Sequence, residues 1–157
     1  MNAPIIKLEF EISQILAAAT ARGRQKQLPY AGELTPRETY QLCSAPGANI
    51  IDVRSHFEHK YIGHIPGSTL IPWKHWPGGE FNEEFLVRLQ NQCALNDIVL
   101  FLCRSGVRSH AAAALAAKAG FTKAFNIIEG FEGDLDSQQQ RGRLGGWRYA
   151  GLPWIQD

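Results

Sequence analysis

The sequence has few cysteines, and they show no spacing that suits a disulfide framework or a structural zinc site. Cys43, Cys93 and Cys103 lie far apart in the 157 residues, and no two of them form a Cys-x-x-Cys pair. Small secreted domains are usually held together by an even number of patterned cysteines. We therefore expect a reduced protein in the cytoplasm.

Long apolar runs and an excess of charge of one sign are also missing. No stretch approaches the roughly 20 apolar residues that cross a bilayer, and the formal net charge is only +1. The N-terminus lacks the basic start and apolar core of a signal peptide, and Glu9 and Glu11 argue against a transit peptide. We expect no nucleic-acid partner and no membrane partner, so any electrostatic function must be local.

The chain does contain an alternation of strand-like and helix-like segments. The spacing of apolar residues predicts strands at 48–53, 69–71, 97–103 and 123–130, and helices at 8–21, 35–43, 82–95 and 109–119. This order is typical of a three-layer α/β domain built on a mainly parallel sheet. We divide the chain into an N-terminal helical extension, residues 1–30, and one domain, residues 31–157. The helix of the extension is expected either to dock a partner protein or to pair with a second copy of the chain in a homodimer.

The segment LFLCRSGVRSHAAAALAAKAG, residues 100–120, carries the strongest chemical signal. Cys103 ends a strand, and the carboxyl ends of parallel strands are where sites form. A glycine-containing loop that enters a helix directs backbone N–H groups inward as an anion nest, and arginines add permanent charge. A thiolate in such a nest is nucleophilic. The pattern therefore predicts Cys103 as the nucleophile and six anion-binding residues: Arg104, Ser105, Gly106, Val107, Arg108 and Ser109.

Three motifs in this order resemble those of the rhodanese family of sulfurtransferases. CRSGVRS, residues 103–109, is similar to the active-site loop of that family. IIDVRSHFEHKYIGHIPGSTLIP, residues 50–72, is similar to its Asp-x-Arg segment with a Gly-His-Ile-Pro-Gly turn, and GLPW, residues 151–154, is similar to its closing motif. The resemblance covers about residues 32–154. It implies a five-stranded, mainly parallel sheet with helices on both faces.

The resemblance also implies a reaction and roles for individual residues. Cys103 would accept sulfane sulfur as a persulfide from thiosulfate or a similar donor and pass it to a small thiol, a protein thiol or cyanide, without a metal or an organic cofactor. Asp52 and Arg54 match the Asp-x-Arg motif, and we interpret them as buried hydrogen-bonding residues that support the site. Arg104 and Arg108 would stabilise the donor anion and the thiolate, unless one of them pairs with a nearby acid.

The sequence departs from the family pattern after the last expected strand. The family has a Gly-Gly-x-x-x-Trp stretch there, whereas this chain reads EGFEGDLD, residues 129–136, followed by an inserted segment, residues 137–146. The insertion either extends over the site, where Arg141 and Arg143 would favour anionic acceptors, or is a solvated loop elsewhere. The identity of the acceptor therefore stays open.

Two other functions stay open as well. One is a non-catalytic module of the same fold that docks a protein partner through the N-terminal helix or residues 129–136. The other is a phosphatase or arsenate reductase, which is disfavoured because the related phosphatases place an arginine six positions after the cysteine, whereas Arg108 is at the fifth.

The remaining histidines and cysteines give weaker signals. His56, His59 and His64 share no ligand spacing with a cysteine or a carboxylate, so surface or turn roles are expected. His110 lies close to the loop in sequence and is otherwise a helix-surface residue. Cys43 and Cys93 are interpreted as small core residues on helical faces.

Overall fold

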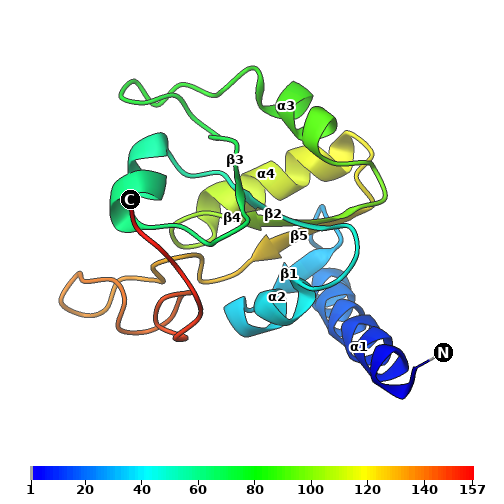
Figure 1. Ribbon diagram of the computed structural model, residues 1–157. Coiled ribbons are helices and arrows are strands. Elements are labelled where there is room, and N and C mark those ends of the chain that lie inside the picture. The colour runs from blue at the N-terminus through cyan, green and yellow to red at the C-terminus, as the bar shows by residue number, and fades with distance from the viewer. Residues whose placement is uncertain (1) are drawn as a thin grey trace.

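The computed structural model describes residues 2–157. Over these residues five strands form one sheet in the order β1-β5-β4-β2-β3 (Figure 1). The strands are β1 (Gly32–Leu34), β2 (Ala48–Asp52), β3 (Thr69–Leu70), β4 (Ile98–Leu102) and β5 (Lys123–Ile127). All neighbouring strands pair in parallel. The expected five-stranded, mainly parallel sheet is therefore confirmed.

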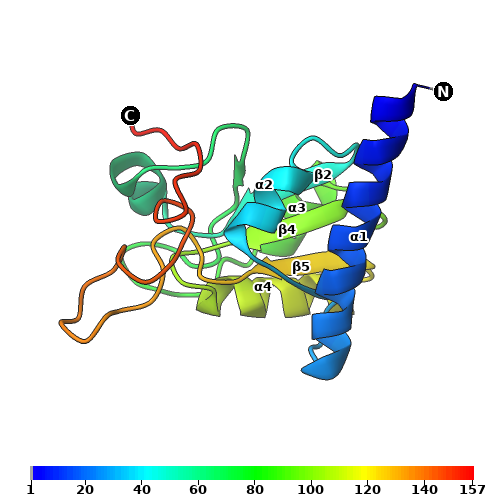
Figure 2. The same cartoon turned by 90° about the horizontal axis from the view of Figure 1, so that it is seen from below.

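Helices cover both faces of this sheet, as expected, and Figure 2 shows α2 and α4 on opposite sides of it. The helical elements are α1 (Ala3–Gln25), α2 (Pro36–Leu42), the π-helical turn η1 (Glu58–Ile62), α3 (Phe85–Gln92) and α4 (Val107–Lys118). α2 begins where the sequence predicts, because Thr35 and Glu38 form a capping box around Pro36. None of the helices that the structure describes has the length and apolarity to cross a membrane.

Strand β4 divides its side chains between two apolar clusters, one on each face. Val99 and Phe101 belong to the cluster under α3 and α4, whereas Leu100 and Leu102 belong to the cluster under α1, α2 and the C-terminal segment. Side chains of a strand alternate between faces, so the residue after Leu102 returns to the first cluster. Cys103 therefore enters the site from the α4 side of the sheet.

The first strand and the extent of the first helix were not found from the sequence. β1 is only three residues long and too short for a periodic pattern, and it is stabilised by pairing with β5. α1 runs well beyond the expected residues 8–21 and packs on β1, where Ala19 is fully buried against Gly32. The other half of α1 extends past the sheet (Figure 2). The division at residue 30 stays a prediction.

The Gly-His-Ile-Pro-Gly turn and the C-terminal motif meet in space. His64 and Ile155 form an antiparallel bridge through both backbone N–H groups, with N···O distances of 2.8 and 3.0 Å. Gly63 has φ of 121°, and a Cβ there would approach the Trp154 ring to 2.7 Å. A side chain at position 63 would therefore push these two segments apart.

Candidate active site

Cys103 lies directly after β4, and two hydrogen-bond donors lie within reach of its sulfur. Its side chain is almost fully buried, and Sγ is 3.1 Å from the Gly106 backbone N–H and 3.2 Å from the Ser109 hydroxyl. Gly106 has φ of 105°, a left-handed conformation that side-chain-bearing residues rarely adopt. The loop therefore curls beneath the sulfur, and the start of α4 directs two donors at it.

The helix after the loop begins earlier than predicted. Gly106 is the N-cap of α4 and Val107 is its first residue, so the expected start at Ser109 is wrong. The left-handed glycine ends the loop, which leaves only residues 104–106 between strand and helix. Of the six predicted anion-binding residues, Arg104 and Val107 are exposed, Ser105, Gly106 and Arg108 are half-buried, and Ser109 is fully buried.

Ser109 connects the sulfur to a buried amide. The Ser109 Oγ atom is 2.6 Å from Asn126 Oδ1, and Asn126 Nδ2 donates to the Gly106 carbonyl over 3.2 Å. A serine hydroxyl carries one proton, so Ser109 cannot donate to Asn126 and to Cys103 at once. With a protonated thiol it donates to Asn126 and can accept from the sulfur, whereas with a thiolate it turns its proton to the sulfur. The hydroxyl thus follows the charge of Cys103.

His110 is hydrogen-bonded to Tyr30. Its Nδ1 is 2.7 Å from the Tyr30 hydroxyl, and the two rings meet edge to face with centroids 5.2 Å apart. Burial raises the pKa of Tyr30, although a hydrogen bond with Asn126 opposes this rise. His110 is therefore an exposed α4 residue that ties the helix to the segment before β1.

The two loop arginines differ in what they contact. Arg108 makes a bidentate ion pair with Glu58, with N···O distances of 2.8 and 2.7 Å. Glu58 is itself fixed by reciprocal hydrogen bonds with Ser55, a capping box that starts the turn of η1. Arg104 is exposed and has no ion-pair partner among residues 2–157. The charge of Arg108 is thus used to hold the loop, and only that of Arg104 is left for a ligand.

Glu58→Gln should destabilise the protein clearly at neutral pH and much less in acid. Burial raises the pKa of Glu58, but the hydrogen bonds from Arg108 and Ser55 outweigh it and lower the pKa from 4.5 to about 2. A carboxyl whose pKa is lower in the folded state stabilises the fold above its unfolded pKa, and this contribution disappears as the pH falls toward the folded value. Urea unfolding of both proteins at about pH 7 and about pH 3 measures the difference.

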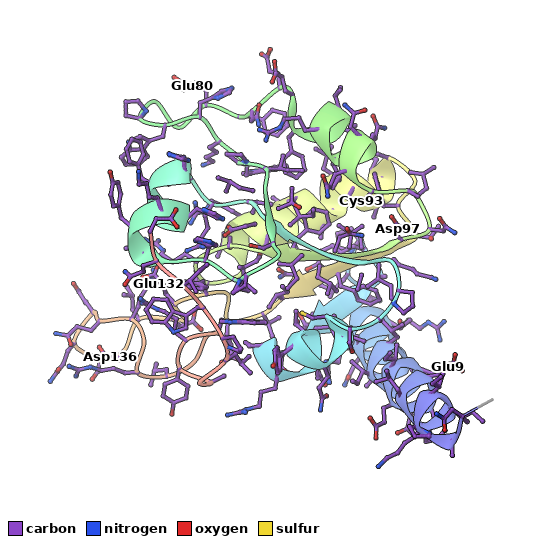
Figure 3. All side chains as sticks on the ribbon, viewed as in Figure 1. Glu9, Glu80, Cys93, Asp97, Glu132 and Asp136 are labelled. Carbon is purple, nitrogen blue, oxygen red and sulfur yellow. The ribbon has the colours of Figure 1, made fainter. Side chains whose placement is uncertain are left out.

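Glu9→Gln is the matched control, because Glu9 is exposed on α1 and far from the loop (Figure 3). This variant should unfold like the wild type at both pH values. A Glu58→Gln deficit of the same size at both pH values would show that the ion pair with Arg108 does not carry the effect.

Asp52 and Arg54 form a fully buried ion pair below the loop. The Asp52 carboxylate accepts from Arg54 Nε at 2.9 Å and from Nη2 at 2.6 Å, and it also accepts from the Arg54 backbone N–H. Arg54 Nη2 also donates to the Gly63 carbonyl, and the guanidinium lies 4.3 Å from the centre of the Phe131 ring. The pair therefore joins the end of β2 to the glycine turn and to the segment after β5.

The segment EGFEGDLD, residues 129–136, holds the cysteine loop through its backbone. The backbone N–H groups of Phe131 and Glu132 donate to the carbonyls of Cys103 and Arg104, each over 2.9 Å. A Cβ at Gly130 would come within 2.5 Å of the Cys103 carbonyl oxygen. This segment departs from the family sequence, yet it holds the loop by main-chain contacts that depend little on its side chains.

The inserted residues 137–146 fold onto their own loop. Asp136 accepts from the backbone N–H groups of Gln138 and Gln140, Arg141 donates to the Gly133 carbonyl, and Arg143 lies 3.7 Å from Asp136. Two pockets adjoin the cysteine loop, of about 530 and 520 Å³, and residues 137–146 line neither of them. The insertion is therefore a loop that lies outside both pockets.

Cys93 lies at the opposite end of the sheet from Cys103. Cys93 and Asp97 are on the far side of the molecule from Glu132 and Asp136 (Figure 3), and Asp97 directly precedes β4, so that six residues of extended chain separate it from Cys103 by about 20 Å. A disulfide requires Cα atoms within about 7 Å, so Cys93 cannot resolve a Cys103 persulfide without unfolding. Cys43 is exposed, so its interpretation as a core residue is wrong.

The histidines predicted to have turn roles lie in η1 and its flanks. His59 and His64 stack with ring centroids 4.0 Å apart, and His64 Nδ1 is 3.1 Å from the His59 carbonyl oxygen. Burial lowers the pKa of His59. No group of three potential ligands that could hold a metal is found in residues 2–157.

Several site residues were missed by the sequence analysis. Glu58 carried a visible signal, because Ser55-x-x-Glu58 is a capping-box pattern. Asn126 carried another, since it is a polar residue inside an apolar strand and such residues are buried only with partners. Tyr30 and the aromatic residues that line the larger pocket, Phe57, Tyr61 and Trp76, carried no signal in the sequence, because only the fold brings them to the loop.

Comparisons with known proteins agree with this arrangement. The family model described as Rhodanese-like domain matches residues 35–136. An uncharacterized protein of Rickettsia conorii is 31% identical over 116 residues, covering 72% of this chain and 87% of the relative. The crystal structure of Rv0390 from M. tuberculosis has 38% sequence identity and a TM-score of 0.73, and the match covers 82% of this chain and 99% of that one.

A third relative carries a description of what it does. YrkF of Bacillus subtilis, named as a candidate sulfur carrier protein, is 37% identical over 90 residues, which cover 57% of this chain and 43% of the relative. The matched family segment contains the buried Asp52–Arg54 pair and the cysteine loop. The chain belongs to the rhodanese-like domain family.

Proposed function

We propose that this protein is a sulfurtransferase that carries sulfane sulfur as a persulfide on Cys103. The observation that supports this most directly is the position of Cys103 Sγ, at a strand end and under two hydrogen-bond donors from the start of α4. The name of the B. subtilis relative, a candidate sulfur carrier, points the same way. Thiosulfate or a similar anion is the proposed donor, and a thiol or cyanide is the proposed acceptor.

The reaction has two steps and needs no outside oxidant. The Cys103 thiolate attacks the outer sulfur of thiosulfate, a new S–S bond forms, and the old one breaks with its electron pair leaving on sulfite. An acceptor thiolate then attacks the terminal sulfur of the persulfide, and the electron pair of that bond returns to Cys103. Such a covalent route produces ping-pong kinetics. Sulfite release beyond one equivalent per protein, dependent on both thiosulfate and an acceptor, tests the proposal, and its absence would contradict it.

The surrounding residues have proposed roles that follow from their contacts. Arg104 binds the donor anion, because its guanidinium is exposed beside the loop. Ser109 and the Gly106 N–H stabilise the thiolate. Arg108, paired with Glu58, and the buried Asp52–Arg54 pair hold the loop in its shape and do not bind the donor anion. We propose that no metal or organic cofactor takes part and that the protein works in the reducing cytoplasm.

Ser109→Ala should slow the reaction of Cys103 at neutral pH. The change removes one of the two donors to the sulfur, and a hydrogen bond to a charged group contributes about 1.5–3 kcal/mol. We expect alkylation by iodoacetamide at neutral pH to fall by about ten-fold or more. Ser105→Ala is the control, because no side-chain hydrogen bond of Ser105 to Cys103 exists in the described structure. Equal rates for wild type and Ser109→Ala at neutral pH would remove Ser109 from the mechanism.

A non-catalytic docking module is the second candidate function. The exposed apolar side chains on the free half of α1 favour it: Ile5, Ile6, Leu8 and Phe10. A homodimer through this helix is the form of docking that we propose. A third candidate, phosphoryl or arsenate chemistry, is disfavoured because the arginine is at the fifth position after the cysteine and is engaged by Glu58.

A further inference from the structure

The larger pocket beside the cysteine loop exceeds what a small inorganic donor requires. Its volume is about 530 Å³, which is within the range of pockets that bind organic ligands. It reaches from the loop, through Arg104 and Arg108, to η1 and to residues 74–79. A substrate that fills it must therefore have an organic body as well as a reacting sulfur.

One wall of this pocket is aromatic and largely open to solvent. Phe57, Tyr61 and Trp76 are 48%, 61% and 66% exposed. Phe57 stacks on Tyr61 with ring centroids 6.3 Å apart and meets the edge of Trp76 at 6.1 Å. These three rings form one continuous surface from two separate segments of the chain. An exposed aromatic cluster inside a pocket is typical of a ligand-binding wall.

The charges around this wall are positive on balance. Glu58 is the pocket's one acidic residue among those described, and Arg108 already pairs with it. Lys74 and Arg104 are exposed, and neither has an ion-pair partner in residues 2–157. The pocket thus presents an aromatic wall and two unpaired cations. Its complement is an anion that carries a flat or extended apolar group.

We propose that this pocket binds the body of the sulfur acceptor, a low-molecular-weight thiol that carries an aromatic or similar apolar group and a carboxylate. This inference rests on the proposed function. The acceptor thiol loses its proton to solvent and attacks the terminal sulfur of the Cys103 persulfide. The bond between the two sulfurs of the persulfide breaks, its electron pair stays on Cys103, and the acceptor leaves as an organic persulfide.

Three thiols separate the contributions of the ring and of the charge. The probe 2-mercapto-3-phenylpropanoate has both groups, 2-mercaptopropanoate lacks the phenyl ring, and 2-phenylethanethiol lacks the carboxylate. With the thiosulfate-loaded protein, we expect kcat/KM for the first probe to exceed that for each of the others by about five- to ten-fold, as one aromatic contact or one ion pair would provide. The thiols also differ in intrinsic reactivity. Each ratio of kcat/KM values is therefore divided by the ratio of the rates at which the same two thiols react with a small free persulfide.

Variants then assign each preference to a side chain. Trp76→Ala should remove the advantage of the phenyl ring and keep that of the carboxylate, whereas Lys74→Gln should do the reverse. The matched controls are Tyr149→Ala and Lys123→Gln, which change an exposed aromatic residue and an exposed lysine outside the pocket. Both controls should keep the wild-type ratios. Thermal unfolding of each variant checks that it is folded.

The outcomes distinguish this inference from the proposed function. Failure of thiosulfate to load sulfur onto Cys103 would reject the proposed function itself. Loading followed by equal use of the three thiols, or ratios that Trp76→Ala and Lys74→Gln leave unchanged, would reject the acceptor pocket and leave the sulfurtransferase in place. Faster transfer to a protein thiol than to any of the probes would also overturn it, because the pocket would then be part of a protein interface.

Discussion

Cys103→Ser is expected to abolish sulfur transfer, with turnover falling at least about 10³-fold, as for the removal of other enzymatic nucleophiles. The hydroxyl of serine is far less acidic than a thiol, and within residues 2–157 the side chain at position 103 contacts hydrogen-bond donors and no histidine or carboxylate base. Cys103 is also the cysteine whose sulfur lies under the Gly106 and Ser109 donors. Sulfite release from thiosulfate in the presence of an acceptor thiol measures the effect.

Cys43→Ser and Cys93→Ala are the controls for this prediction. Cys43 is exposed at the end of α2, and Cys93 lies at the far end of the sheet. Burial together with Asp97 raises the pKa of Cys93 to about 11, which keeps it a thiol near neutral pH. Each control should retain turnover close to wild type. Turnover that persists in Cys103→Ser and disappears in either control would place the persulfide on another cysteine and contradict the site assignment.

The largest loss of stability is expected for Arg54→Ala, at about 3–5 kcal/mol. Both partners of the Asp52–Arg54 pair are completely buried, so the variant leaves a carboxylate without its counter-charge in the protein interior. It also removes the hydrogen bond to Gly63 and the contact with the Phe131 ring. Since domains are usually stable by about 5–15 kcal/mol, urea unfolding should shift to a much lower midpoint.

Arg143→Ala is the matched control, since Arg143 also faces an aspartate but at the surface, 3.7 Å from Asp136 with its side chain 58% exposed. We expect no measurable change in its unfolding midpoint, because exposed ion pairs contribute little. An Arg54→Ala protein as stable as Arg143→Ala would show that the buried pair is not needed for the fold.

The sequence predicted those features that depend on local patterns. The strand-like segment at 97–103, apolar from Ile98 onward, identified β4, and Thr35, Pro36 and Glu38 located the start of α2. The position of Cys103 at a strand end before a helix followed from the same patterns. These features could be predicted because helix caps and the spacing of buried side chains depend on residues that are close in the sequence.

The features that were missed depend on contacts between distant segments. β1 exists through its pairing with β5, and Arg108 is engaged because η1 brings Glu58 to the loop from fifty positions away. The start of α4 was placed too late because Gly106 was interpreted as a loop residue, whereas its left-handed conformation makes it the N-cap. The aromatic wall combines Phe57 with Trp76, whose proximity only the fold establishes.

The most direct test of the persulfide on Cys103 is intact-mass spectrometry of the protein after exposure to thiosulfate and removal of excess reagent. The account predicts a gain of one sulfur atom, located by peptide mapping on the fragment that contains Cys103 and released by cyanide or a thiol. Wild-type protein that gains no sulfur, or that gains it equally in the Cys103→Ser variant, would contradict the account.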